Sequence, residues 1–292
     1  MTGFFQLLTS GVMVGSIYGL LALGFVLIYK SSHIFNFAIG AMVMLSAYIA
    51  YSMMSELGLP YWLAVILTIV ISMAIGALFE RWPLRPLVGQ PTLSIIMVTI
   101  AISSLISGLS SALWGKALVR GFPSDFLSAK SFQFGDVIIS QQRLWAFVIC
   151  ILLTGLLAVF FRKTRTGLNM RATADGHKLA QSTGIKVNSV IRNAWMIAAF
   201  VCSVGGILLG AMSGVTPDLA DVAMKALPAA LVGGLESLPG AVIGGIIIGI
   251  VETMLSGYIG GGLGEIGAFI VVLLVLIFRP YGLAGLKIIE RV

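Results

Sequence analysis

Charge is scarce in this chain, and so are the residues that carry most enzyme chemistry. Only 10% of the 292 residues are charged, whereas 59% are hydrophobic. This composition excludes an ordinary soluble globular protein. Several apolar stretches reach the roughly 20 residues that a helix needs to cross a bilayer. We therefore expect an all-α polytopic membrane protein with about eight transmembrane helices plus broken or re-entrant segments, forming a single permease-like domain over residues 1–292.

Motifs for catalysis and metal binding are absent from the sequence. It contains no P-loop of the form G-x-x-x-x-G-K-[ST], no H-E-x-x-H and no G-x-S-x-G. The two cysteines, Cys150 and Cys202, lie in apolar stretches without metal-ligand spacing. Paired carboxylates within an apolar segment, which a proton relay needs, are missing too. We predict no catalytic residue, no metal site and no enzymatic activity; a membrane enzyme acting on lipids would need a polar cluster that the sequence lacks.

What the chain does have is one long polar stretch, residues 162–192, between two apolar spans. It holds seven cations and one acid, Asp175, and thus +6 of the chain's formal charge of +7. Positively charged loops resist translocation, so we expect this stretch to be cytoplasmic. The alternative is a solvated loop that only sets the topology. The cations are Arg162, Lys163, Arg165, Arg171, Lys178, Lys186 and Arg192.

Within residues 162–192 the sequence fits a short helix. Thr173 or Asp175 could cap its N-terminus, and Gly184 fits its C-terminus. Leu179 and Ala180 would supply a small apolar face. A capped helix between two spans predicts a docking element for a cytoplasmic partner.

The charges also predict the orientation of the spans. The apolar runs before residue 214 cover about 4–29, 37–54, 61–79, 92–113, 144–161 and 194–212. If each crosses once, Lys30, Arg81 with Arg85, and the stretch 162–192 all lie on one side, which should be cytoplasmic. Segment 114–143 would then be an external loop, and its mixed charges suggest some structure of its own.

Two features of the first spans point to packing or to a transport path. Gly11, Gly15 and Gly19 share one face of the first span and would let another helix approach closely, or alternatively line a pathway. His33 and Asn36 stand at the start of the second span. Their side chains could bond to backbone groups at a helix break, or Asn36 could hold a broken helix that lines the path.

The last third of the chain contains interrupted apolar segments. The stretch 221–236 is broken by Pro228 and by Gly233-Gly234, and broken helices are a sequence pointer to a transport path. We therefore name Asn36, Pro228, Gly233, Gly234 and Glu236 as candidate pathway residues, with Glu236 expected in a turn. Glu252 is expected at an interfacial helix end or beside a buried partner. The three stretches 221–236, 241–255 and 268–278 either all cross or include re-entrant pieces.

Four segments resemble the LivH-type permeases, the membrane subunits of branched-chain amino acid ABC importers. Residues 15–48 are similar to their opening, and residues 164–185, TRTGLNMRATADGHKLAQSTGI, to their cytoplasmic coupling loop. Residues 230–245, ALVGGLESLPGAVIGG, and 279–285, RPYGLAG, match further signatures. The resemblance covers almost the whole chain in order. It assigns ATPase coupling to Arg171, Asp175, Lys178, Leu179, Ala180 and Gly184.

The resemblance implies a heteromeric importer in the bacterial inner membrane. Its partners would be a second related permease, two cytoplasmic ABC ATPases and a periplasmic substrate-binding protein, with no nucleic acid involved. ATP and Mg would be bound by the partners, and this chain would bind no cofactor. One departure concerns the cargo: Ile39 and Ala41 stand where the family commonly has His and Glu. Urea, short amides or aromatic acids are therefore alternative cargoes, and a stand-alone secondary carrier or channel is the alternative mechanism.

Overall fold

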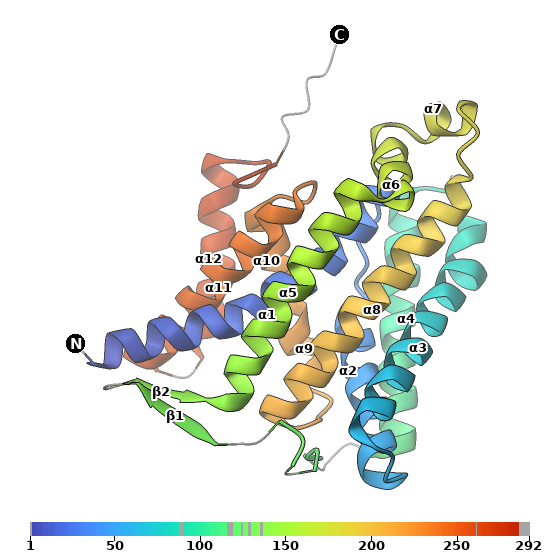
Figure 1. Ribbon diagram of the computed structural model, residues 1–292. Helices are drawn as coiled ribbons and strands as arrows, with labels where there is room; N and C mark the ends of the chain where they lie inside the picture. The colour runs from blue at the N-terminus through green and yellow to red at the C-terminus, as the bar shows by residue number, and fades with distance from the viewer. Residues whose placement is uncertain are drawn as a thin grey trace. The chain divides into compact units, whose positions relative to one another are not determined.

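The computed structural model describes residues 2–87, 90–115, 119–123, 125–127, 130–134, 137–260 and 262–285, apart from the side chains of Thr2, Phe134, Val137, Asp175, His177, Lys178 and Glu265. The helices of this part are accompanied by one two-stranded hairpin and by short connections (Figure 1). Six of its helices are long and apolar enough to cross a membrane. The predicted polytopic all-α fold is therefore confirmed. The spans are Gly3–Ser32, Tyr61–Leu87, Thr92–Trp114, Gln141–Lys163, Val187–Ser213 and Leu238–Tyr258.

The remaining apolar helices are shorter. They include α2, which continues without a break into the π-helical turn η1, and α12. The prediction of about eight crossings requires both of these to cross as well. The elements in chain order are α1 Thr2–Ser32, α2 Ile39–Tyr51, η1 Ser52–Glu56, α3 Tyr61–Phe79, η2 Glu80–Leu84, η3 Arg85–Leu87, α4 Thr92–Trp114, β1 Ser131–Phe134, β2 Val137–Ser140, α5 Gln141–Lys163, α6 Arg165–Asp175, α7 His177–Ser182, α8 Val187–Ser213, α9 Leu219–Met224, α10 Ala226–Gly233, α11 Leu238–Tyr258 and α12 Leu263–Phe278.

Contacts divide the chain into two compact units. Unit 1 comprises residues 1–26, 130–158 and 225–292, and unit 2 comprises residues 27–129 and 159–224. Unit 1 thus holds the hairpin and the helices α10, α11 and α12, together with most of α1 and α5. Unit 2 holds α2, α3, α4, α6, α7, α8 and α9. The expectation of a single permease domain stays a prediction.

The central helix of unit 2 is α2. It packs against α3, α4, α8 and α9, and ten of its 13 residues are buried. Glycine permits two of these close approaches: a Cβ on Gly40 would collide with the carbonyl of Ala220, and one on Gly206 with the carbonyl of Val43. By contrast, few residues of α3 and α4 are buried, as expected for helices that face lipid.

Unit 1 is held together by glycines on α1 and α11. A Cβ on Gly11 would lie 2.8 Å from Ile250 Cα, and one on Gly15 would lie 2.7 Å from the Gly245 carbonyl oxygen. On the facing helix, Gly245 and Gly249 have the backbone of α1 where their own side chains would be. The glycine face predicted for the first span is therefore a packing face.

The hairpin confirms that segment 114–143 has structure of its own. β1 pairs with β2 antiparallel, from Ser131 opposite Ser140 to Phe134 opposite Val137. The Gln6 amide donates to the Ile138 carbonyl and accepts from the Ile138 N–H, both at 2.8 Å, so α1 is fixed to the hairpin edge. The predicted loop was too long, because α4 runs to Trp114 and α5 begins at Gln141.

The basic stretch is also shorter than residues 162–192. Helix α5 continues through Lys163, and α8 begins at Val187. The first turns of α8 are amphipathic: Val187, Val190 and Ile191 are buried and Arg192 is exposed. Charged residues at span ends do not end a helix, because long side chains reach toward water while their stems stay in apolar surroundings.

Candidate functional site

Two short helices, α6 and α7, fill the basic stretch between α5 and α8. Thr164 caps α6, since its hydroxyl accepts a hydrogen bond from the Gly167 N–H at 3.1 Å. The prediction that Thr173 or Asp175 caps the helix ending at Gly184 is wrong, because the N-cap of α7 is Gly176 and no side chain caps that helix. Thr173 is buried inside α6 and its hydroxyl donates to the Asn169 carbonyl at 2.8 Å, while Asp175 is the last residue of α6. The sequence could have identified Thr164 as the cap, because threonine often caps a helix by accepting a hydrogen bond from the N–H three residues later.

The C-terminus of α7 is built as the sequence predicts. Gly184 has a φ of +85°, which glycine adopts without the strain that a side chain brings. The N–H of Gly184 donates to Gln181, and that of Ile185 to Ala180, both at 3.0 Å. These two bonds form a complete Schellman motif, which satisfies carbonyls left open at the helix end.

The side chains of α7 divide between the interior and the surface. Leu179 is 71% exposed, whereas Ala180 is 3% exposed. Leu179 and Ala180 therefore do not form one apolar face as predicted, because adjacent helical residues point about 100° apart. Arg171 is half-buried on α6. The side chains of Asp175 and Lys178 lie outside the described ones.

The α6 end of this segment contacts the break between α1 and α2. At that break His33 has a φ of +54°, and its Nε2 lies 3.4 Å from the Ala174 carbonyl oxygen, at the end of α6. Asn36 is buried, and its Oδ1 accepts from the Ala38 N–H at 2.9 Å. The predicted helix break with backbone-bonded polar side chains is confirmed. His33 thus joins the end of α6 to the connection into the central helix α2.

A second break separates α9 from α10. The helix is interrupted at Lys225, three residues before Pro228, and Pro228 itself lies in the first turn of α10. The prediction of a break at Pro228 was therefore displaced by one turn. Proline cannot donate to the carbonyl four residues earlier and its ring crowds that carbonyl, whereas in a first turn its missing N–H is not needed.

The glycines that follow end α10 against other backbone. Helix α10 ends at Gly233, and Gly234 has a φ of +102°. The N–H groups of Leu283 and Ala284 donate to the carbonyls of Val232 and Gly233 at 2.8 and 3.1 Å. Open carbonyls of the broken helix are thereby satisfied within the protein, as an apolar environment requires. Two segments that are far apart in sequence, residues 230–245 and 279–285, thus form one structural unit.

These contacts describe the setting of the candidate pathway residues. Pro228, Gly233 and Gly234 are buried within unit 1, and Glu236 lies in the turn between α10 and α11, as expected. Asn36 belongs to unit 2, as do all the coupling residues. Their assignment to a pathway or to coupling stays a prediction.

Sequence reasoning missed one ion pair in the apolar part of unit 1. The Lys225 Nζ lies 2.6 Å from Glu252 Oε1, and the side chains are only 16% and 14% exposed. Glu252 Oε2 is buried without a hydrogen-bond partner among the described residues. The pair links the α9–α10 break to the middle of α11. Glu252 therefore has the buried partner that was one of its two expected placements, and an isolated Lys225 in an apolar run was the available signal.

Comparison with known proteins finds relatives that match almost the whole chain. The family model described as "Branched-chain amino acid transport system / permease component" matches residues 7–278. The permease protein BraD of a high-affinity branched-chain amino acid transport system of Pseudomonas aeruginosa is 33% identical, over 99% of this chain and 98% of the relative. LivH of Escherichia coli, named in the same way, is 32% identical over the same shares. A probable LivH of Methanocaldococcus jannaschii is 27% identical, over 96% of this chain and 92% of the relative. The chain therefore belongs to the family of branched-chain amino acid transport system permease components and is a multi-pass membrane permease subunit rather than an enzyme.

Proposed function

We propose that this chain forms part of the translocation pathway of an ABC importer for branched-chain or related small amino acids. Near-full-length similarity to permeases named for branched-chain amino acids carries this proposal. The importer lies in the bacterial inner membrane. It contains a second related permease, two ATPases that bind ATP and Mg, and a periplasmic binding protein that selects the cargo. This chain binds no cofactor.

In this proposal, the α6–α7 segment (residues 165–182) transmits the conformational change of the ATPases to the membrane helices. It is basic, it carries an exposed leucine, Leu179, and its α7 end is fixed by Gly184. An exposed apolar side chain on a rigid element is the kind of residue that a partner buries at an interface. Through the contact of Ala174 with His33, displacement of the segment reaches the α1–α2 break.

A second cargo class is favoured by one observation. Ile39 and Ala41 are fully buried in the first turn of α2, beside Asn36, where the family commonly has a histidine and a glutamate. Neither side chain offers a carboxylate that could pair with the ammonium group of an amino acid, and urea, short amides and aromatic acids have no ammonium group. Urea, short amides and aromatic acids are therefore the alternative cargoes.

The experiment that tests the assembly is a pull-down of this chain from its native membrane in mild detergent, with partners identified by mass spectrometry. Two P-loop ATPases and a second polytopic subunit are expected. Uptake of leucine into proteoliposomes should then require ATP and the binding protein. A chain that is recovered alone, and that transports without ATP, would instead be a carrier or channel.

Replacing Gly184 with valine should uncouple ATP hydrolysis from transport. A β-branched residue is strained at a φ of +85°, so the end of α7 should unwind and displace Leu179. We expect ATP-driven uptake to fall roughly tenfold, equivalent to about 1.4 kcal/mol of weakened docking, with normal membrane insertion. The matched control is Gly58→Val, because Gly58 has a φ of +61° and open space around it but lies outside the α6–α7 segment. Equal uptake by the two variants would show that α7 has no role in coupling.

Thiol labelling should place the end of α5, which leads into α6, and the hairpin on opposite sides of the membrane. The native cysteines, Cys150 and Cys202, are buried, so background labelling should be small. We expect Lys163→Cys to react only when a membrane-impermeant maleimide reaches the cytoplasmic side, and Phe132→Cys, in the hairpin, only from outside. Labelling of Lys163→Cys in intact, sealed cells would overturn the topology.

A further inference from the structure

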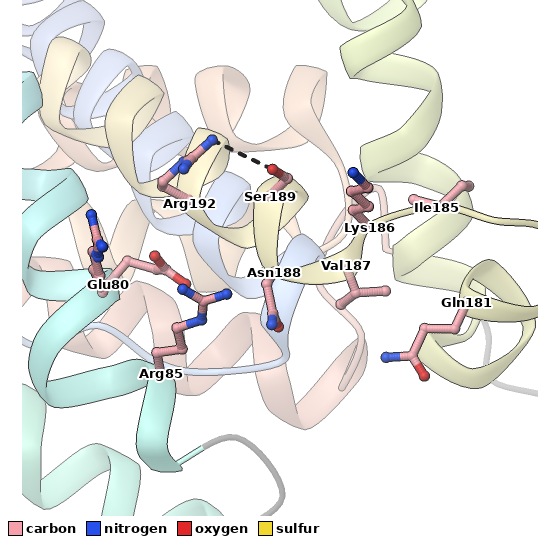
Figure 2. A pocket seen from close by; sticks show the side chains of 10 residues that line it. Glu80, Arg85, Gln181, Ile185, Lys186, Val187, Asn188, Ser189 and Arg192 are labelled. Atoms are coloured by element: carbon pink, nitrogen blue, oxygen red, sulfur yellow. Dashed lines mark hydrogen bonds between the residues drawn. The ribbon is translucent and has the colours of Figure 1, made fainter.

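A basic pocket lies where the end of α3 meets the beginning of α8. Its volume is about 470 Å³, and Arg81, Arg85, Lys186 and Arg192 contribute four positive charges to its wall. Glu80 contributes one negative charge, which leaves a formal excess of four minus one, or +3. The neutral polar residues Asn188 and Ser189 complete the side formed by α8 (Figure 2). Charge and hydrogen-bond donors together make the pocket complementary to an anion.

A buried acid lies among the cations of this pocket. Glu80 is only 3% exposed and lines the same pocket as Arg81, Arg85 and Arg192. Figure 2 shows Glu80 and Arg85 pointing toward each other, and Arg192 Nη2 donates to Ser189 Oγ at 3.4 Å. Among the described residues, no carboxylate lies within 4.0 Å of the four cations. The single buried acid therefore offsets only one of the four positive charges.

An apolar groove adjoins this pocket, and residues 79–85 contribute to the walls of both. The groove has a volume of about 720 Å³ and runs between α3 and α4, where Ile102 and Leu105 contribute to its wall. Phe79, Trp82 and Pro83 line the groove, while Glu80, Arg81 and Arg85 line the basic pocket. Residues 79–85 therefore present an apolar surface on one side and cations on the other.

This combination favours one class of ligand over others. A free phosphate would use the basic pocket alone, and so would an acidic side chain of a partner protein. An anionic phospholipid uses both surfaces, since its phosphate sits at the end of the membrane spans and its acyl chains run along apolar helix faces. The pocket also lies at one end of two spans, because α3 ends and α8 begins beside it.

We propose that this chain binds an anionic phospholipid here, with the headgroup phosphate in the basic pocket and an acyl chain in the groove. The lipid comes from the leaflet at which α3 ends. It would connect α3, α4 and α8 to the end of α7 and the residues that follow it, because Gln181, Ile185 and Lys186 form the far wall of the pocket. This site is independent of the transported substrate.

Trp82 provides a direct readout. The purified importer, in mild detergent, is titrated with phosphatidylglycerol or phosphatidylcholine carrying the same brominated acyl chains, and the quenching that is lost in a Trp82→Phe variant is assigned to Trp82. We expect half-maximal quenching by phosphatidylglycerol at a mole fraction about tenfold lower than by phosphatidylcholine. Arg85→Gln combined with Arg192→Gln should abolish this preference. The control Arg162→Gln with Lys163→Gln removes two exposed cations at the end of α5 and should preserve it.

Three results would overturn the proposal. Equal quenching by the two lipids would remove the headgroup specificity. Full competition by inorganic phosphate, together with no effect of the groove-filling variant Leu105→Trp on binding, would identify a free-anion site. Protection of the pocket arginines by the ATPase subunits in the assembled importer would assign it to a protein partner. If the double arginine variant fails to fold, the single variants Arg85→Gln and Arg192→Gln give the same comparison.

Discussion

Alanine at both Gly245 and Gly249 should unfold unit 1 under conditions in which the parent protein is stable. A Cβ at either position would coincide with the backbone of α1, at Gly19 and Gly15. A flexible side chain could move aside, but helix backbone cannot do so without separating α1 from α11. Overpacking of this kind costs about 1–3 kcal/mol per site, so we expect a loss of about 4 kcal/mol for the pair.

The matched control for this variant is Gly155→Ala. Gly155 lies in the helix α5 of the same unit, and a Cβ there would have open space around it. Alanine should therefore be neutral or stabilise by roughly 0.5–1 kcal/mol, because glycine is a poor helix former. Titration with a denaturing detergent, monitored by circular dichroism, gives the free energies of unfolding. Equal stability of the two variants would show that α1 and α11 are not in direct backbone contact.

Removing one member of the Lys225–Glu252 pair should be more damaging than removing both. Lys225→Met leaves a carboxylate in apolar surroundings with one oxygen that already has no partner among the described residues. Glu252→Leu leaves a buried ammonium. Breaking a buried pair in this way costs about 3–5 kcal/mol, whereas replacing both partners by apolar residues is often neutral or stabilising. We therefore expect the double variant to regain most of the stability that either single variant loses.

The pair Arg120–Glu56 supplies the comparison. Its atoms are 3.6 Å apart and its side chains are 23% and 46% exposed, so Glu56→Gln should cost less than about 1 kcal/mol. Measuring uptake by the double variant distinguishes a structural role of Lys225 and Glu252 from a role in the transport cycle. Recovery of uptake in the double variant would make the pair structural, whereas a stable double variant without uptake would place it in the transport cycle. A loss of stability in the double variant equal to the sum of the losses in the two single variants would contradict the buried pairing itself.

Local sequence patterns predicted the features that depend on neighbouring residues. The bounds of α3 and nearly all of α4 follow from apolar runs that end at turn residues. Gly184 and Gly234 could be identified as helix ends because only glycine adopts their backbone angles easily. The first turns of α8 were missed because the charge of Arg192 was given more weight than the helical spacing of Val187, Val190 and Ile191.

Whatever depends on partners distant in the chain was decided by the tertiary structure. The sequence by itself determined a polytopic helical permease, a basic segment between α5 and α8, and a glycine face on α1. It could not say that this face meets Gly245 and Gly249, or that Lys225 is neutralised by Glu252. It also could not say that Leu283 and Ala284 cap α10. In an apolar surrounding every charge and backbone group needs a partner, and only the packing of helices selects which one.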